Sequence, residues 1–272
     1  MISTGTKFDS GGRLMDEISP LHPRAESLRI RKKLVDGFKM GLVVEEGLAA
    51  HGRGEAFDYL LGERTTREAR RAIKAAAAAL VLAERPVISV NGNAAALVPE
   101  ELVELSRVAG AKLEVNLFHG SRARERAIAR WLRQHGASEV LGVDPRFTTR
   151  IREVHSQRRK VDQRGIAVAD VVLVPLEDGD RTEALKRLEK RVVAIDLNPM
   201  SRTARAADIT IVDNIVRAMP LLVAEVRRLS KLPQRSAKRI IDNFDNDSSL
   251  RAAYRLMQDG LRRLAVAGTP RR

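Results

Sequence analysis

The stretch ADVVLVPLEDGDRTEAL, residues 169–185, decides the fold of this chain. Its residues 171–174 are a short apolar run of the kind that forms a buried strand. The run leads into residues 175–182, a polar loop with three acidic side chains and Gly179, and this loop opens a predicted helix. A buried strand that passes through a polar turn into a helix is the repeating unit of a parallel α/β sheet.

The same alternation of strand and helix extends in both directions along the chain. Apolar strands are predicted at residues 87–90, 113–116, 140–143, 192–195 and 209–212, and helices at 99–108, 121–135 and 214–229, with a long basic helix at 145–164. Strands of this kind are buried on both faces. The pattern therefore predicts an α/β fold, a Rossmann-like, mostly parallel sheet flanked by helices, with right-handed crossovers.

Helical segments are predicted on both sides of this core. Residues 19–48 contain a helix, residues 49–54 form a break, and residues 55–61 form a short helix that ends at Gly62. An alanine-rich helix follows, capped at Thr65-Thr66 and ending at Leu82. Beyond Pro233 the chain is amphipathic and basic. We therefore divide the chain into a helical N-terminal segment (1–84), a Rossmann-like nucleotide-binding core (85–232) and a basic helical C-terminal segment (233–272), packed as one compact unit.

The composition excludes several classes of protein. Of the 272 residues 44% are hydrophobic, none is cysteine, and the formal net charge is +14. Without cysteine there are no disulfides, thiolate metal sites or cysteine nucleophiles. The sequence contains no apolar run long enough for a membrane span or a signal sequence, so we expect a cytoplasmic protein with no membrane partner.

The positive charge leaves one alternative open. A surface this basic attracts polyanions, including nucleic acid, nucleotides and phosphorylated metabolites. Only 3% of the residues are aromatic, whereas single-strand binders stack bases on aromatic side chains. A nucleic-acid-binding protein on a Rossmann-like scaffold is therefore the less favoured reading.

Ligands of parallel sheets bind beyond the carboxyl ends of the strands, which makes the loop at residues 175–182 the leading candidate. Its Gly179 permits a close backbone approach, and Asp180 or Thr182 is expected to cap the helix. Arg181 is expected to meet a phosphate, and Asp178 or Asp180 to hold a ribose hydroxyl or Mg²⁺. The alternative is an ordinary polar loop with a helix cap.

Other strand ends carry weaker signals. Asp196 ends a predicted strand at a place where an acidic side chain often receives a ribose, although a strand-terminal turn explains it equally. Asn91-Gly92-Asn93 is a glycine turn after a buried strand, and His119 with Arg122 precedes a predicted helix. Upstream, two glycines flank Arg53, so the backbone either bends around a ligand or simply joins two helices.

Several familiar catalytic motifs are absent. The sequence has no G-x-G-x-x-G after its first strand, which argues against a dehydrogenase, and no Walker A ending. It also lacks H-E-x-x-H, G-x-S-x-G and the protein-kinase motifs. The absence of these motifs fits an enzyme that positions its substrates and neutralises charge, rather than one that forms a covalent bond to its substrate.

Six stretches, taken in order between Leu21 and Pro220, resemble the archaeal phosphopantothenate synthetase (4-phosphopantoate–β-alanine ligase) family. They are HPRAESLRIRKKLVDG, GLAAHGRGEAFDYLLGE, PVISVNGNAAALVPEE, AKLEVNLFHGSRARE, ADVVLVPLEDGDRTEAL and IDLNPMSRTARAADITIVDNIVRAMP. The resemblance implies a Rossmann-like homodimer of coenzyme A biosynthesis. It also implies an AMP-forming ligation of 4-phosphopantoate with β-alanine, through an acyl-adenylate, with ATP and Mg²⁺.

Site residues are assigned by combining this resemblance with the glycine loops and strand ends. ATP is assigned to Asp178, Gly179, Asp180, Arg181, Thr182, Asp196, Leu197 and Asn198, with Arg24 and Lys39 as further phosphate contacts. Phosphopantoate is assigned to Arg53, Asn91, Asn93, His119 and Arg122. Arg53 is also a candidate catalytic residue, and His51 or His119 is the candidate that helps to deprotonate the attacking amine.

Overall fold

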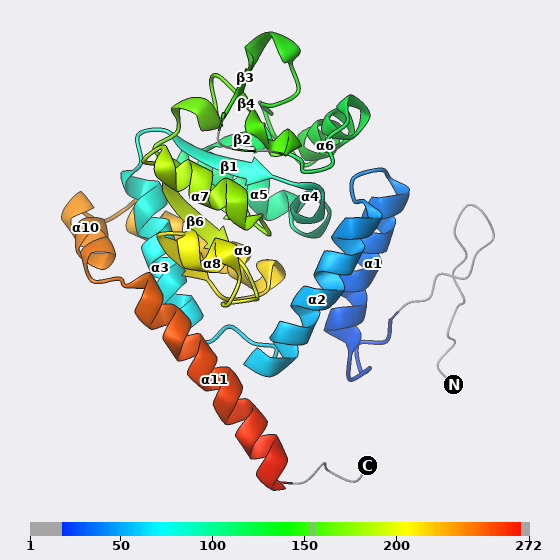
Figure 1. The fold of residues 1–272 in the computed structure, drawn as a ribbon, viewed down its shortest axis with the longest axis vertical. Helices are drawn as coiled ribbons and strands as arrows, with labels where there is room; N and C mark the ends of the chain where they lie inside the picture. The colour runs from blue at the N-terminus through cyan, green and yellow to red at the C-terminus, as the bar shows by residue number, and fades with distance from the viewer. Residues whose placement is uncertain (1–17, 153, 155, 268–272) are drawn as a thin grey trace.

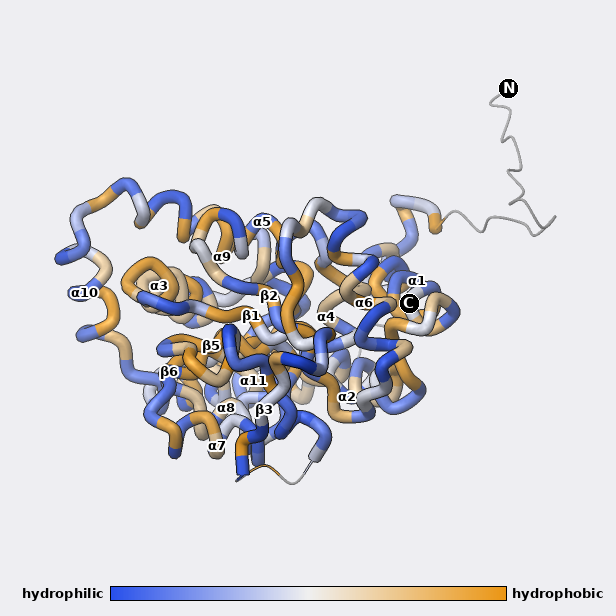
Figure 2. The backbone as a smooth tube through the Cα atoms, turned by 90° about the horizontal axis from the view of Figure 1, so that it is seen from above, coloured by the Kyte–Doolittle hydropathy of each residue, from blue (hydrophilic) through white to orange (hydrophobic). Residues whose placement is uncertain are grey.

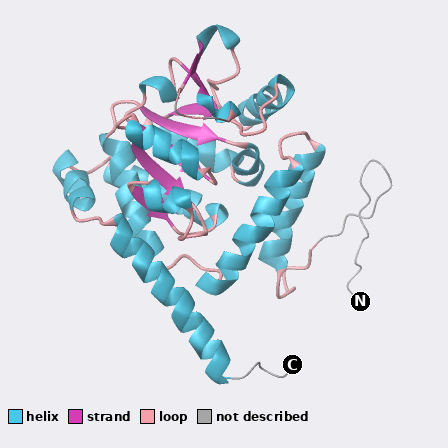
Figure 3. Ribbon diagram, viewed as in Figure 1, coloured by secondary structure: helices cyan, strands magenta, loops and turns pink. Residues whose placement is uncertain are grey.

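The computed structural model describes residues 18–152, 154 and 156–267 and has an α/β architecture (Figure 3). In this part of the chain, five parallel strands form one sheet in the order β2-β1-β5-β6-β7 (Figure 1). The strands are β1 (Pro86–Val90), β2 (Lys112–Val115), β5 (Val171–Pro175), β6 (Arg191–Ile195) and β7 (Ile209–Ile211). The predicted parallel sheet flanked by helices is therefore confirmed.

Helices cover both faces of the sheet. On one face Ile88, Leu113 and Leu173 belong to a core shared with α3 (Arg67–Leu82), α5 (Pro99–Ala109) and α9 (Ile215–Leu229). On the other face the alternate strand residues, such as Val172, pack with α7 (Gly179–Arg187). This alternation places hydrophobic side chains in the centre of the molecule, as Figure 2 shows along the central strands.

The alanine-rich helix α3 forms as predicted. Thr66 caps it by accepting a hydrogen bond from the Ala69 amide at 3.0 Å. The alanines at residues 75–79 are fully buried. Their small side chains let α3 pack closely against α9 and α10 (Gln234–Asp242).

The predicted break at residues 49–54 is wrong. Helix α1 (Ala25–Lys39) ends earlier, at a turn with Gly41 at φ +72°, and α2 (Glu45–Leu61) runs unbroken through His51-Gly52-Arg53-Gly54. The glycine of α2 that permits a close approach is Gly47, where a Cβ would overlap the side chain of Asn93, whereas a Cβ on Gly52 would meet nothing within 4 Å. The ending of α2 at Gly62, in the left-handed conformation, is confirmed.

The predicted basic helix at residues 145–164 is also wrong. This segment contains the antiparallel pair β3 (Thr148–Arg150) and β4 (Lys160–Asp162), with the short 3₁₀ turns η1 (Pro145–Phe147) and η2 (Gln157–Arg159). A third 3₁₀ turn, η3 (Ile166–Val168), follows it. The apolar residues of the segment, Ile151, Val154 and Val161, are buried against one face of the sheet. The predicted strand at 140–143 shrinks to a single bridge between Leu141 and Glu114, because Gly142 turns the chain at φ +83°.

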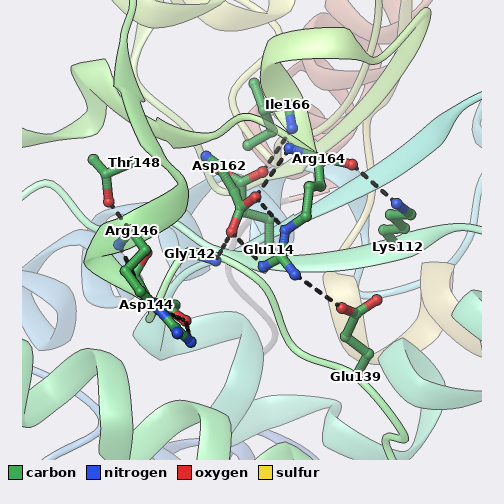
Figure 4. A network of polar contacts seen from close by, with 10 residues as sticks. All are labelled: Lys112, Glu114, Glu139, Gly142, Asp144, Arg146, Thr148, Asp162, Arg164 and Ile166. Carbon is green, nitrogen blue, oxygen red and sulfur yellow. Dashed lines mark hydrogen bonds and ion pairs between the residues drawn. The ribbon is translucent and has the colours of Figure 1, made fainter.

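A buried carboxylate fastens this segment to the sheet (Figure 4). Glu114 of β2 is fully buried and accepts hydrogen bonds from the amides of Ile166 at 2.6 Å and Asp162 at 2.9 Å. Asp162 in turn forms an ion pair with Arg164 at 3.0 Å. A Cβ on Gly165 would overlap the Glu114 carboxylate, so only glycine fits at this contact.

Glu114 should make stability depend on pH. Burial raises its pKa to about 7 from an ordinary 4.5, so between these values the folded chain binds more protons than the unfolded chain. Stability therefore falls as pH rises through that window. We expect Glu114→Gln to remove this component, worth on the order of 3 kcal/mol at about 1.4 kcal/mol per pKa unit. Urea unfolding at pH 5, 6, 7 and 8 measures it, and parallel pH curves for the two proteins would contradict it.

The C-terminal segment is helical, as predicted, and packs onto the core. Helix α11 (Asn246–Ala267) contacts α2, α3 and β7 (Figure 1). At its start the Asn246 side chain accepts a hydrogen bond from the Thr210 amide at 2.7 Å. No helix in the described residues is sufficiently long and apolar to cross a bilayer. The predicted absence of a signal sequence concerns mainly residues 1–17, which lie outside the described part.

Candidate ligand-binding site

A cleft opens where the strand order reverses. Strand β2 follows β1 on one side, whereas β5 pairs with the other side of β1, so the loops after β1 and β5 diverge from one point. Open α/β sheets bind ligands at such switch points. The cavity there, which we call the main cleft, has a volume of about 410 Å³. Its walls include His51, Arg53 and Phe57 of α2 and residues 176–179, 196–198 and 201–203 of the loops after β5 and β6.

Three helices begin at this cleft. Helix α7 begins after Asp178, α8 (Arg202–Ala206) after Ser201, and α9 after Asn214. The caps Ser201 and Asn214 accept hydrogen bonds from amides of their own helices, whereas the Asp178 side chain accepts none from α7. The first amides of α7 lack partners within the helix, so this end of the cleft favours an anion.

Gly179 brings two helix starts together. A Cβ at this position would overlap the Cβ of Arg202, and the Arg202 backbone would lie about 3.3 Å away. The close backbone approach predicted at Gly179 is thus present, and the element that lies close to Gly179 is α8. The expectation that Asp180 or Thr182 caps the helix is wrong, because the chain enters the helical conformation at Gly179 and makes Asp178 the cap residue.

Asp196 lies at the end of β6 in the wall of the cleft. Its carboxylate accepts hydrogen bonds from the Ser201 hydroxyl at 2.5 Å and the Asn198 amide at 2.9 Å. Burial raises its pKa, and the charge of Arg53 across the cleft opposes that shift. Leu197 and Asn198 follow it along the same wall.

Helix α2 supplies the opposite wall. Arg53 has no carboxylate within 4 Å among the described residues, which leaves its guanidinium available to a ligand. The His51 Nε2 atom is buried and has no hydrogen-bond partner in the described part of the chain. Burial also lowers the pKa of His51, which favours the neutral imidazole near pH 7.

A second cavity adjoins the main cleft, and we call it the side chamber. Its volume is about 270 Å³, and it shares Ala50, Asn93, Leu176 and Asp178 with the main cleft. The predicted substrate residues Asn91 and His119 also line it.

The two asparagines of the β1–α4 turn support the backbone around both cavities. Asn91 donates to the carbonyls of Pro175 at 2.7 Å and Leu176 at 3.1 Å and accepts from the Ala94 amide. These bonds hold Leu176 at φ +54°, a conformation that costs a leucine energy. Asn93 donates to the Gly47 carbonyl at 2.8 Å and so joins α4 (Gly92–Leu97) to α2.

Several other predicted residues lie elsewhere. Arg181 is completely buried below the cleft, where it forms an ion pair with Glu177 and donates to the Ser89 hydroxyl at 3.0 Å. Thr182 is also buried, and its hydroxyl donates to the Asp178 carbonyl. Arg24, Lys39 and Arg122 line neither the main cleft nor the side chamber, and Asp180 lies one residue beyond the lining loop. Arg122 instead lines a separate cavity of about 530 Å³ beside β3 and β4.

Sequence reasoning missed two basic residues of this region, Arg124 and Arg158, which line the side chamber. Arg124 lies in the first turn of a helix, a position that could have drawn attention to it. Arg158 had no such signal, because its segment was predicted to be a helix.

The fold and the cleft define an α/β protein with a cavity of small-molecule size at the carboxyl edge of a parallel sheet. A sequence model of the family described as phosphopantothenate/pantothenate synthetase matches residues 68–260. The 4-phosphopantoate–β-alanine ligase of Thermococcus kodakarensis is 52% identical over 95% of this chain and 98% of its own length. The ligase of the same name from Methanosarcina mazei is 47% identical over 93% of this chain and 98% of its own. The chain belongs to the phosphopantothenate/pantothenate synthetase family.

Proposed function

We propose that this protein is a 4-phosphopantoate–β-alanine ligase, which joins the two compounds in coenzyme A biosynthesis. The support is its similarity to ligases of that name over almost the full length of both chains. The cleft carries the argument on the structural side, since a family that ligates a phosphorylated acid needs a basic site at the sheet edge. These relatives give no support to the nucleic-acid alternative.

ATP is assigned to the main cleft. The cleft has the size of a small-molecule site, and the start of α7 suits a phosphate. Asp196 stands at a strand end, where a carboxylate accepts hydrogen bonds from ribose hydroxyls. Arg53 adds positive charge on the wall formed by α2, whereas the guanidinium of Arg202 forms an ion pair with Glu183 at 2.9 Å.

The chemistry consists of two displacements. A carboxylate oxygen of phosphopantoate attacks the α-phosphorus of ATP, and pyrophosphate leaves. The amine of β-alanine then attacks the resulting acyl-adenylate, an amide bond forms, AMP leaves and the amine loses a proton. Both steps move negative charge among phosphate groups, so arginines and helix starts stabilise them without a covalent residue.

Mg²⁺ is assigned to the phosphates of ATP, with Asp178 or Asp180 as protein ligand. The described residues contain no group of three acidic or histidine side chains that would hold a metal by themselves. Mg²⁺ commonly uses one or two carboxylates together with substrate phosphates, and this arrangement fits the acidic start of α7. Bound there, Mg²⁺ would supply charge neutralisation.

The proposed function includes a homodimer that works in the cytoplasm. A pyrophosphate-release assay with ATP, Mg²⁺, 4-phosphopantoate and β-alanine, each omitted in turn, tests the reaction. Release that requires every component, with AMP and 4-phosphopantothenate as products, is the expected result. A folded protein that binds ATP and shows no turnover would refute the ligase assignment.

Asp196→Asn should weaken ATP binding about tenfold, because the loss of a hydrogen bond to a charged acceptor costs about 1.4 kcal/mol or more. Titration calorimetry with ATP measures the effect. Asp36→Asn is the control, since Asp36 is exposed on α1 and pairs only with Lys32 among the described residues. Equal affinities in the two variants would remove Asp196 from the nucleotide site.

His51 and His119 remain the candidates for the group that takes the proton from the amine. His51 lines the main cleft and His119 the side chamber. We expect His51→Gln to lower kcat with little change in ATP affinity, because the neutral imidazole of His51 is the form that accepts a proton. His119→Gln is the matched variant, and full activity of both across the pH range would exclude the hypothesis.

A further inference from the structure

The side chamber contains basic groups, two of which, both arginines, the function assigned above does not use. Three of its lining residues are basic: His119 of the β2–α6 loop, Arg124 in the first turn of α6 (Arg122–Gln134), and Arg158 of η2. They come from separate parts of the chain and converge on one cavity of about 270 Å³. The chamber opens into the main cleft along their shared wall.

Arg158 is a buried cation at the base of this chamber. Its side chain is 7% exposed, contacts Glu177 through Nη1, and lies with Nε 3.0 Å from Asp178 Oδ2. Neither nitrogen has well-aligned hydrogen-bond geometry to any described residue. Burial lowers the pKa of Arg158 to about 10, so the guanidinium stays charged at neutral pH. A buried charge of this kind is stabilised by an anion that completes its hydrogen bonds.

Arg124 adds a charge that forms no ion pair within the described residues, although Glu46 and Glu125 lie near enough to act on it. Its two terminal nitrogens donate to carbonyls, those of His119 and of Leu42, the latter at 3.0 Å. Its Nε is buried and has no hydrogen-bond partner within the described residues. No carboxylate of those residues lies within 4 Å of the group, so its positive charge persists in the chamber wall.

Three guanidinium groups and three carboxylates of the described residues surround the chamber, so its formal charge is balanced, and an excess of positive charge inside it depends on the screening of Glu46 at the mouth. Glu177 and Asp178 offset Arg158 together with the buried Arg181. The charge of Arg124 is left over. Glu46 stands at the mouth near His119, but its side chain is 64% exposed and therefore well screened by water. Guanidinium groups that converge on a small cavity favour a dianionic phosphate over a neutral hydroxyl.

We propose that the side chamber binds the phosphate of the phosphorylated acid, and that Arg124 and Arg158 are the residues that select this acid over its unphosphorylated form. The inference rests on the proposed function and extends it. With the phosphate in the side chamber, the carboxylate end of the acid reaches the shared wall at Asp178 and Leu176. That wall is where the acid would meet the nucleotide in the main cleft.

The test is calorimetric binding of 4-phosphopantoate and of pantoate, without ATP, followed by ATP alone. We expect Arg124→Met to weaken 4-phosphopantoate binding about tenfold to a hundredfold, as expected for lost charge-assisted hydrogen bonds, and to leave ATP and pantoate affinities within about twofold. Arg158→Lys should also weaken 4-phosphopantoate binding, because lysine keeps the positive charge but lacks the planar guanidinium that donates two parallel hydrogen bonds. Arg126→Met is the matched control, since Arg126 is an exposed arginine of the same helix and lines neither the side chamber nor the main cleft.

The outcomes separate this inference from the ligase assignment. Unchanged 4-phosphopantoate affinity in Arg124→Met would overturn the inference, as would a loss of ATP affinity instead, which would place nucleotide phosphates in the chamber. If Arg158→Lys does not fold, Arg124→Met carries the test alone. A wild-type protein that binds 4-phosphopantoate and catalyses nothing would refute the ligase assignment, while the same binding series would still decide the phosphate site.

Discussion

Arg217→Met should lower the free energy of unfolding by about 3–5 kcal/mol, because it leaves two buried carboxylates without their positively charged partner. Arg217 Nη2 lies 2.5 Å from Asp58 Oδ1 and 2.8 Å from Asp213 Oδ1. The side chain of Asp58 is 7% exposed and that of Asp213 is 0% exposed, so water cannot replace the guanidinium. Urea unfolding at pH 7 measures the loss.

The same network joins two walls of the main cleft. Asp58 belongs to α2 and Asp213 follows β7, so Arg217 fastens the α2 wall to the sheet. The control is Arg228→Met on the same helix, which breaks a pair with Glu225 at the surface and should cost less than about 1 kcal/mol. Adding Asp58→Asn to Arg217→Met should recover part of the loss. A loss no greater than that of the control would show that the network does not stabilise the fold.

Gly179→Ala should weaken ATP binding about 30-fold, with the free energy of about 2 kcal/mol that overpacking typically costs. The added methyl group would overlap Cβ of Arg202 and press on the backbone of α8, so the starts of α7 and α8 must separate. The first amides of α7 would then move away from the position that the proposed phosphate site requires. Calorimetric titration with ATP measures the change.

The control for Gly179 is Gly52→Ala. Gly52 lies on the exposed side of α2, and a Cβ there meets nothing within 4 Å. Alanine at such a helical position should leave ATP affinity unchanged and stabilise the fold by about 0.5–1 kcal/mol. If both variants bind ATP like the wild type, the approach of α7 to α8 has no part in nucleotide binding.

The sheet could be predicted from sequence because its strands are short, apolar and bounded by glycine or polar turns. Residues 86–90 and 171–175 are buried at every position, and a local pattern records such burial. The segment around Arg158 could not be predicted in this way. Its many arginines favour a helix by local propensity. The observed fold instead depends on Glu114, which lies far away in the sequence and accepts hydrogen bonds from the amides of Ile166 and Asp162.

The residues of the site could also be predicted only in part from the sequence. Strand ends identified Asp178, Gly179 and Asp196, which all line the main cleft. Residue type alone could not separate a ligand contact from a structural support. Arg181 looks like a phosphate contact in the sequence, but its side chain turns inward to Glu177 and Ser89. Whether an arginine faces a cavity or the interior is decided by packing, which a local motif does not record.

Helix α2 is one wall of the main cleft and the sheet edge is the other, so the two must be together for a ligand to touch both. Nucleotide binding and the docking of α2 are therefore linked equilibria. The apparent affinity for the nucleotide is proportional to the fraction of molecules in which α2 is docked, so undocked molecules lower it. In return, a bound ligand stabilises the docked state by mass action, by about 2.7 kcal/mol at a hundred times its Kd. The protein should accordingly resist heat and proteases better when its nucleotide is abundant than when it is scarce.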